Sequence, residues 1–410
     1  MLAPQGFFGT TKAQIQPSRA GIMSGFAPHQ KEVLMITIRP GSHAYELLLL
    51  LANVGEFPIA SLDLLGSART WKALINKLTK SQWFFFPDSG KKIQCILLNV
   101  TGKGKYKTVR LYKGGLPALK LLNEDAYDYY MEYSSNHQMA GDQAHIERNH
   151  RVAEAAVMCQ NAGIEIRPYM LPQLQADRIY RRSFTGPTFY NGRDLKKLKQ
   201  DEMSKTMYSR MVGAIFSPGG GYVVYNTRNA LMKWHGTGEF KALMDVLEIS
   251  RLNTDLEDFR SAVLFGRDYQ IALRTLEDIS KSRRMDMRFD ATYPFIHFIP
   301  MSSFGCDMLR ILTLPDWKRN LLESLFESEE LSNDRGSFEY DALVDGTYIL
   351  CHFDGDITRL MRFRGAIKDR PGQYEVLCYP EQVAFLRTYL GENVSLKVLT
   401  MDEIKAFFDD

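Results

Sequence analysis

The first part of the chain has apolar positions at the spacing of buried and amphipathic helices. Residues 43–54 are apolar on nearly every side, which predicts a helix surrounded by other parts of the protein. A short helical segment follows at 59–65, bounded by Pro58 and Gly66. Residues 68–80 repeat apolar side chains at i, i+3, i+4 and i+7, which predicts a third, amphipathic helix. Its apolar positions are Trp71, Leu74, Ile75 and Leu78.

After the third helix, the pattern changes to one typical of strands. Residues 83–86, 93–100 and 106–112 are rich in aromatic and β-branched side chains and are separated by turn residues. Three helices followed by strands that a loop connects is the element order of a winged helix-turn-helix. We therefore expect a winged helix-turn-helix domain at 33–123, preceded by a flexible arm at 1–32.

The second half of the chain alternates strand-like and helix-like segments. Two strands, at 211–217 and 222–227, are separated by a proline and three glycines, which indicates a hairpin. Later segments alternate between the two types, which favours a partly parallel sheet flanked by helices. We predict a larger mixed α/β domain at 208–410, for which a degenerate restriction-endonuclease-like fold is one form. A helical and basic connection at 124–207 precedes it.

Composition narrows the class of protein. With 410 residues, 45% hydrophobic and 24% charged, the chain resembles a soluble globular protein of two or three domains. Its five cysteines are far apart and form no CxxC pair, and its histidines have no metal-like spacing. We therefore expect a reducing cytoplasm, no metal and no cofactor. Its apolar runs are far shorter than the roughly 20 residues needed to span a bilayer, so we expect no membrane partner.

Positive charge is concentrated between Gly66 and Lys120. This segment contains twelve Lys and Arg residues and one acid, Asp88. It has a charge of +11, whereas the whole chain has +3, so the other residues together carry −8. Such crowding causes self-repulsion, and duplex DNA relieves it because each neutralised phosphate releases counterions. Double-stranded DNA is therefore the expected partner, although a solvated helix face would produce a similar charge run.

The candidate DNA-binding residues come from three places. The polar side of the third helix carries Arg and Asn, which read guanine and adenine in the major groove. The turns of the strand region carry lysines that would reach phosphates. A second basic run, 178–199, interleaves aromatic residues, which suits single strands or a surface linker. The candidates are Arg69, Thr70, Lys72, Asn76, Lys77, Lys80, Lys91, Lys92, Lys103, Lys105, Lys107, Arg110, Arg181 and Arg182.

Catalytic signals are weaker than the charge signal. A restriction-like nuclease needs an Asp on one strand and Glu-x-Lys on the next, together holding Mg²⁺. Glu239 and Lys241 match the Glu-x-Lys pattern, but they follow two glycines and lie at the start of a predicted helix. The preceding strand has Asn226 and no carboxylate. Further carboxylates lie in turn-like contexts, where Asp is common for turn reasons alone. These are Asp341, Asp345, Asp354 and Asp356.

Several phrases resemble the replication-relaxation family of winged-helix proteins from bacterial plasmids and integrative elements. These are "YKTVRLYKGGLPALKLL" (106–122), "HIERNHRVAEAAVMCQNAGIEIRP" (145–168), "YSRMVGAIFSPGGGYVVYNTRNALMKW" (208–234) and "YEVLCYPEQVAFLRTYL" (374–390). The resemblance implies a DNA-binding protein of plasmid replication, relaxation or transfer. The partners we consider with it are a second copy of the chain and replication or transfer proteins. A Mg²⁺-dependent nuclease or nicking enzyme, and a ligand-sensing transcriptional repressor, are the alternatives.

Overall fold

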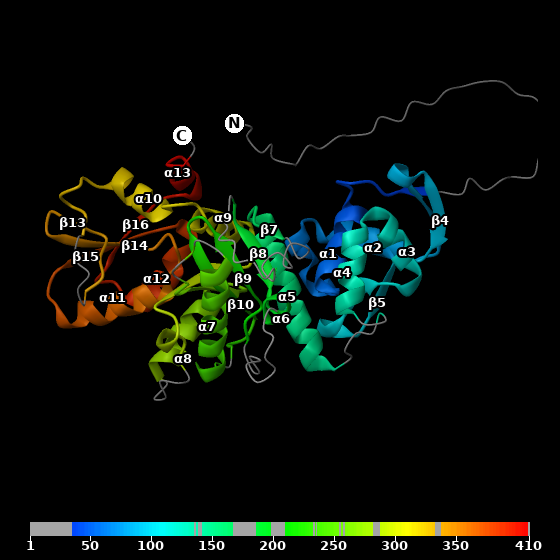
Figure 1. The fold of residues 1–410 in the computed structure, drawn as a ribbon. Helices are drawn as coiled ribbons and strands as arrows, with labels where there is room; N and C mark the ends of the chain where they lie inside the picture. Colours follow the sequence, from blue (N-terminus) through cyan, green and yellow to red (C-terminus); the bar gives the residue numbers. More distant parts are fainter. Residues whose placement is uncertain are drawn as a thin grey trace, which may run out of the picture.

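A long helix, α5 (Gln143–Asn161), lies between the two ends of the molecule. Figure 1 shows the amino-terminal elements on one side of this helix and the carboxyl-terminal strands at the opposite end. The predicted arm at 1–32 and most of the basic run at 178–199 are outside the residues that the computed structural model describes. The described residues are 35–134, 137, 142–166, 186–197, 210–232, 234, 236–253, 256, 259–281, 288–332 and 338–408.

The amino-terminal lobe begins with the three expected helical segments. The first helix is buried along most of its length, as its apolar sequence predicts, and Ser42 caps its start. A three-stranded antiparallel sheet in the order β2-β6-β5 completes this part of the lobe. Its elements are α1 (His43–Val54), β2 (Glu56–Pro58), the 3₁₀ segment η1 (Ile59–Leu65), α2 (Ala68–Leu78), β5 (Leu98–Thr101) and β6 (Thr108–Leu111).

A separate hairpin is inserted between α2 and β5. Strands β3 (Gln82–Phe86) and β4 (Lys91–Cys95) pair with each other and with β1 (Met35–Thr37), forming a second small sheet. The single strand expected at 93–100 is therefore wrong. The chain leaves the hairpin after Cys95, and the Leu97 amide donates to the Leu78 carbonyl (3.1 Å) at the end of α2. The chain therefore forms two strands, in two different sheets, where its sequence predicted one.

Two further helices complete the lobe, α3 (Leu116–Leu122) and α4 (Glu124–Tyr133). We expected a polar connection from residue 124 onward, but α4 packs against α1 and α3. Its apolar face buries Ala126, Tyr129 and Tyr130, whereas its acids point outward. The polar composition of this segment is thus that of an amphipathic helix with a narrow buried side.

The larger part of the chain is built on two sheets. The six-stranded sheet has the order β12-β11-β10-β9-β8-β7, in which β10, β11 and β12 are parallel and β9 is antiparallel to both of its neighbours. The predicted hairpin and the expected mixture of helices and strands are confirmed. The strands are β7 (Glu165–Ile166), β8 (Thr188–Asn191), β9 (Gly213–Ser217), β10 (Gly220–Arg228), β11 (Ser261–Gly266) and β12 (Phe295–Pro300), with helices α6 (Gly192–Lys197), α7 (Gly236–Asn253) and α8 (Tyr269–Lys281).

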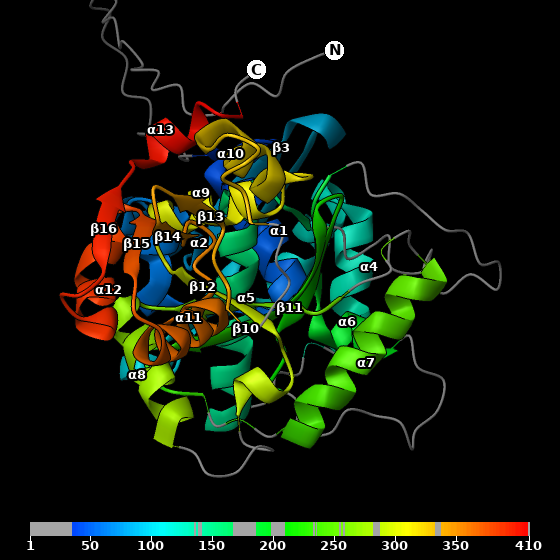
Figure 2. The ribbon, with the colours of Figure 1, turned by 90° about the vertical axis from the view of Figure 1, so that its left-hand side faces the viewer.

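The second sheet has the order β13-β14-β15-β16, with the last three strands parallel. Figure 2 shows α11, α12 and α13 around these strands, with α9 and α10 nearby. The elements are α9 (Ser303–Leu312), α10 (Trp317–Leu325), β13 (Ala342–Val344), β14 (Thr347–Cys351), α11 (Ile357–Asp369), β15 (Gln373–Cys378), α12 (Val383–Leu390), β16 (Ser395–Val398) and α13 (Met401–Lys405). Short 3₁₀ segments are η2 (Pro87–Ser89), η3 (Gly104–Tyr106), η4 (Lys113–Gly115), η9 (Phe289–Ala291) and η10 (Pro380–Gln382).

One hydrophobic core connects the amino-terminal lobe with the sheets. It includes Leu51 of α1, Val157 of α5 and Leu309 of α9, all almost completely buried. Helix α5 contacts β2 on one side and β10 and α9 on the other. The lobe is therefore packed on the rest of the protein through α5. Among the described helices, none has the length and apolar character to cross a bilayer.

Candidate nucleic-acid interface

Helix α2 is held by its apolar face and by its first turn. The Ser67 hydroxyl accepts from the Thr70 amide, which satisfies one of the free donors at the helix start. The indole of Trp71 donates to the Leu65 carbonyl (2.8 Å) and ties α2 to the preceding η1 segment. Trp71, Ile75 and Leu78 are buried, as the spacing of apolar residues predicts. These contacts fix which side of α2 faces solvent.

The outward side of α2 is basic and exposed. The structure exposes every candidate residue on this helix, together with Lys80 just after it. Among the described residues, no carboxylate forms an ion pair with Arg69, Lys72, Lys77 or Lys80 within 4 Å. Within the described part of the chain, solvent ions and not carboxylates therefore compensate these charges. A polyanion could replace those ions with a gain in counterion entropy.

The loop between β5 and β6 carries the second group of lysines. Gly102 has φ of 77°, and a Cβ there would lie 2.3 Å from the Tyr106 carbonyl oxygen, so the tight turn needs glycine. Lys103, Lys105 and Lys107 are exposed. Lys105 approaches Glu147 of α5 at 3.5 Å, an exposed ion pair that contributes little to stability. The loop is thus shaped by its glycines and leaves its lysines in solvent.

Arg110 has a structural role that its sequence position did not reveal. Its guanidinium lies 2.7 Å from Glu56, which is completely buried, and Asn149 donates to the other carboxylate oxygen (2.7 Å). Three elements, β6, β2 and α5, therefore meet at one neutralised carboxylate. Because this charge is already paired, Arg110 is a structural residue and we leave it out of the DNA-facing set.

The inserted hairpin presents a third basic group. Lys91 and Lys92 are exposed at the start of β4, in a sheet separate from the loop that carries Lys103. On the same hairpin, Trp83 pairs with Gln94, two residues beyond Lys92, and is 37% exposed; Met35, its partner in the parallel register, is 41% exposed. An accessible indole can stack on bases while lysines of the same hairpin contact phosphates. The basic strands of the sequence thus belong to two different hairpins.

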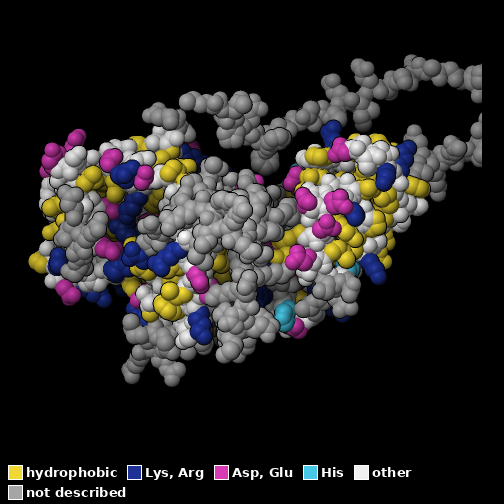
Figure 3. All heavy atoms as spheres, viewed as in Figure 1, with side chains coloured by type: hydrophobic (Ala, Val, Ile, Leu, Met, Phe, Trp, Pro, Cys, Tyr) yellow, Lys and Arg dark blue, Asp and Glu magenta, His cyan; other side chains and the backbone are white. Residues whose placement is uncertain are grey.

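The lobe carries opposite charges on different faces. Helix α4 exposes a row of acids, which are Glu124, Asp125, Asp128 and Glu132. Figure 3 shows magenta acidic side chains over the front of this lobe and blue basic side chains toward its outer edge. A duplex would be repelled by the α4 face. Acidic and basic side chains of this lobe are therefore carried by different helices: the exposed residues of α4 include four acids, whereas α2 itself contains none.

Other predicted site residues are distributed differently. Arg181 and Arg182 lie outside the described residues. Glu239 is fully buried in the first turn of α7, where it accepts from the Arg210 amide (2.7 Å) and the Tyr225 hydroxyl (3.0 Å). Lys241 is exposed two residues later, and positions two apart on a helix face different directions. The structure therefore does not bring this pair together as metal and phosphate ligands.

Replacing Glu239 with alanine should destabilise the fold. It should not abolish DNA cleavage, because we expect the wild type to cleave no DNA. The change removes the acceptor of the Arg210 amide and one of the partners of the buried Tyr225 hydroxyl, which also contacts the Tyr293 hydroxyl. One unsatisfied group costs about 1–3 kcal/mol. Urea unfolding measures this loss. In parallel, supercoiled plasmid with Mg²⁺ should stay intact with both the wild type and the variant. Cleavage by the wild type that disappears in Glu239→Ala at unchanged stability would contradict this assignment.

The hairpin of β9 and β10 has a polar cluster where a nuclease would need carboxylates. Strand β9 has none, and β10 ends in a bulge that contains Asn226 and Arg228. Arg228 lies 2.9 Å from Glu154 of α5, and the Asn226 amide donates to the same carboxylate (3.1 Å). The guanidinium of Arg228 thus neutralises Glu154, the carboxylate described at this position, so Glu154 does not need a metal cation for charge balance.

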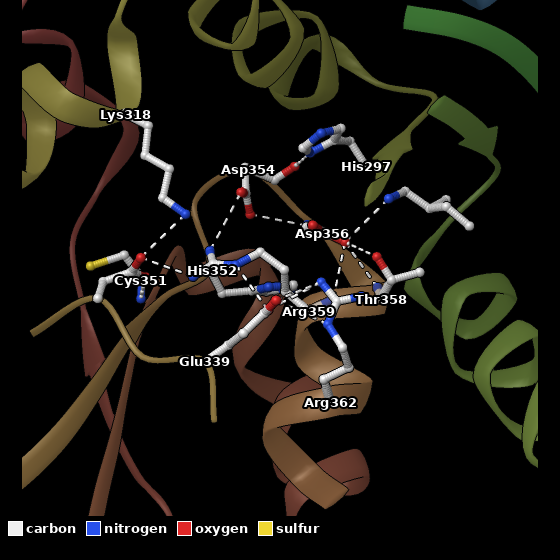
Figure 4. Close-up of polar contacts among 12 residues, drawn as sticks. His297, Lys318, Glu339, Cys351, His352, Asp354, Asp356, Thr358, Arg359 and Arg362 are labelled. Carbon is white, nitrogen blue, oxygen red and sulfur yellow. Dashed lines mark hydrogen bonds and ion pairs between the residues drawn. The ribbon is translucent and has the colours of Figure 1, made fainter. Parts of the chain in front are cut away.

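The remaining carboxylates gather around one buried arginine, shown in Figure 4. Arg359 of α11 lies 2.8 Å from Asp341 and 3.8 Å from Asp354, and Lys318 of α10 also reaches Asp341 (3.2 Å). Asp356 caps α11 by accepting from the Thr358 amide (2.9 Å). In the part of the chain that the structure describes, no group of three or more acidic, His or Cys side chains could hold a metal ion. Asp345 is separate, in the exposed turn between β13 and β14.

This charged cluster changes the pKa values of its members. Burial alone would raise the pKa of Asp354, but Lys318, His297 and Arg359 lower it to about 2. Burial lowers the pKa of the neighbouring His352 to about 4, so its imidazole is neutral at pH 7. The ionised carboxylates are therefore held by cations from two helices. The sequence marked the carboxylates, but it offered no sign of their partners Lys318 and Arg359.

Comparisons with known proteins identify no relative of this chain. No protein-family model matches the chain, no curated protein is significantly similar to it, and no solved structure shares its fold at a significant level. The functional argument therefore depends on the residues themselves.

Proposed function

We propose that the amino-terminal lobe is a winged helix that binds duplex DNA. In such a fold, the strand after the first helix pairs with the second strand of the wing, and the sheet order β2-β6-β5 agrees with this. Helix α2 then corresponds to the recognition helix, and the loop with Lys103 and Lys105 corresponds to the wing. The observation that carries the proposal is the exposed, acid-free face of α2, whose cations have no ion-pair partner among the described residues.

The proposed contacts divide into two kinds. Arg69 and Asn76 on α2 can form bidentate hydrogen bonds with guanine and adenine in the major groove, which gives base preference. Lys72, Lys77 and the wing lysines neutralise phosphates, which gives affinity without base preference. The inserted hairpin with Lys91 and Lys92 would extend the phosphate contacts beyond those of a helix and a single wing.

We assign no catalysis to the α/β part of the chain. A restriction-endonuclease-like domain would be degenerate here, because the β9–β10 hairpin carries Asn226 and Arg228 in place of metal-binding carboxylates. Its role would be to dimerise, to contact replication or transfer proteins, or to support the DNA-binding lobe. Together with the resemblance in sequence, this suggests a cytoplasmic DNA-binding protein of a mobile genetic element.

Single substitutions should separate base reading from phosphate binding. Asn76→Ala or Arg69→Ala should reduce the preference for a selected site over random duplex by roughly 5- to 150-fold, the value of one bidentate base contact. Lys103→Ala should weaken all sequences alike and lower the salt slope by about 0.9. Fluorescence anisotropy with a site selected from a random library, measured across a salt series, gives both quantities. Equal losses on both duplexes for all three variants would remove α2 from base recognition.

A further inference from the structure

A pocket lies where the amino-terminal lobe meets the α/β part of the chain. It has a volume of about 320 Å³, which is within the range of small-molecule sites. The end of α1 supplies Val54, α5 supplies Arg148 and Asn149, and the start of α6 supplies Arg193. Asn191 of β8 and the backbone leading into β9 complete the wall. The pocket therefore touches both parts of the protein at once.

The two arginines of this pocket differ in their surroundings. Among the described residues, no carboxylate lies within ion-pair distance of Arg148, which is exposed, although the buried Glu239 attracts its charge from further away. Glu56, another buried carboxylate, is already paired with Arg110 and accepts from Asn149. The guanidinium of Arg193 lies over the rings of Tyr129 and Tyr133, 5.4 and 4.6 Å from their centres, which holds it in place.

A buried acid lies beside Arg193. Asp194 lies 3.8 Å from the Arg193 Nε atom, is completely buried and accepts from the Tyr129 hydroxyl (2.9 Å). Burial raises the pKa of Asp194, whereas Arg193 and the hydroxyls of Tyr133 and Tyr129 lower it. At the other side of the pocket, desolvation and the like charge of Arg210 lower the pKa of Arg148, against the attraction of Glu239. A bound anion would relieve the repulsion between Arg148 and Arg210.

The pocket also contains an acceptor without a donor. The Asn191 side chain donates to Asn53 (2.9 Å), but its own Oδ1 atom is buried and has no hydrogen-bond partner. Such a group costs free energy unless a ligand or water supplies a hydrogen. An anion alone would not do so. A ligand that carries a hydroxyl beside its charge would satisfy both Asn191 and the arginines.

We propose that this pocket binds a phosphate ester with free hydroxyl groups, of the nucleotide or sugar-phosphate class. Its phosphate would lie against Arg148 and Arg193, and a hydroxyl would donate to Asn191. Arg193 also donates to the Asn53 backbone carbonyl of α1, so the ligand would lie where α6 contacts the amino-terminal lobe. Duplex DNA is the other source of a phosphate at this position, and the experiment separates the two sources.

The test is calorimetric titration of the full chain with ribose 5-phosphate, with AMP and with inorganic phosphate. We expect one of the two esters to bind with one site, and Arg148→Gln to weaken it at least tenfold. The matched control is Arg274→Gln, which removes another exposed arginine, on α8, and should change nothing. Thermal unfolding of Arg148→Gln should stay close to the wild type, because this side chain is exposed and forms no ion pair with the described residues.

The outcomes are distinguishable from those of the DNA-binding proposal. If no ester binds, but Arg148→Gln lowers the salt slope for DNA by about 0.9, the result supports a phosphate site that DNA itself fills. If Arg148→Gln alters neither ester binding nor DNA binding, the proposed site is overturned. Failure of the wild type to bind any duplex would count against the winged helix alone, because ester binding is measured without DNA.

Discussion

Replacing Arg69, Lys72 and Lys77 together with alanine is expected to lower the affinity for duplex DNA by roughly 100-fold or more. Each of these exposed cations would lose one phosphate or base contact, and three lost phosphate contacts lower the salt slope by up to about 2.7. The three side chains point away from the buried face of α2. The midpoint of thermal unfolding should therefore remain within a few degrees of the wild type.

A matched triple variant controls for the change in net charge. Lys241, Arg274 and Lys368 are exposed on α7, α8 and α11, and alanine at all three removes the same charge far along the chain from α2. We expect this variant to bind DNA within about threefold of the wild type, since distant charges are screened beyond about 10 Å at 0.1 M salt. Similar losses in both triple variants would mean that total charge, and not the α2 face, determines binding.

Replacing Arg359 with leucine is expected to destabilise the carboxyl-terminal sheet by about 3–5 kcal/mol, enough to unfold it in mild denaturant. The arginine is almost completely buried. Its loss removes one of the cations that compensate Asp354 and the closer of two cations that pair with Asp341, where Lys318 remains at 3.2 Å. A buried carboxylate that loses a paired cation is costly. Lys368→Leu, an exposed position on the same helix, should change stability by less than about 0.5 kcal/mol.

The pH dependence distinguishes charge from packing in this cluster. In the wild type, Asp354 has a pKa of about 2 in the folded state and about 3.9 when unfolded. Its ionic stabilisation is therefore complete above about pH 4 and is lost as the pH falls toward 2. In Arg359→Leu, Lys318 and His297 still lower this pKa, but the loss of one cation moves it toward the unfolded value. The variant should therefore lose less stability than the wild type as the pH falls from 4 to 2. Equal losses in both proteins over this range would show that packing, and not charge, causes the destabilisation.

The predicted elements were correct where a segment has a regular or continuous apolar pattern. The buried face of α2 follows its apolar spacing, and the predicted hairpin strands at 211–217 and 222–227 correspond to the buried strands β9 and β10. Helix α11 was not predicted, because buried Arg359 occupies a position that the helical pattern reserves for an apolar residue. Strand β14 was not predicted either, because Asp and Gly residues lie on both sides of its five-residue run. Tertiary ion pairs thus override the pattern on which sequence reasoning depends.

The candidate site was predicted in part for a related reason. Exposure of the lysines on α2 and in the β5–β6 loop follows from local spacing, because their environment is set within a few residues. The pairing of Arg110 with Glu56 joins positions 54 residues apart, and the charge run contains no sign of it. The pocket at Arg148 and Arg193 likewise forms only when α1, α5 and β8 meet. Contacts of this kind require the folded structure.

Photo-crosslinking of the full chain to a duplex with photoreactive bases, read out by mass spectrometry, tests the central claim most directly. The account predicts crosslinks within 69–77 on α2 and within 102–107 in the β5–β6 loop, and their loss in the Arg69, Lys72 and Lys77 triple variant. It predicts none on the acidic α4 face at 124–132. Crosslinks confined to α4 or to the α/β part of the chain would contradict the account.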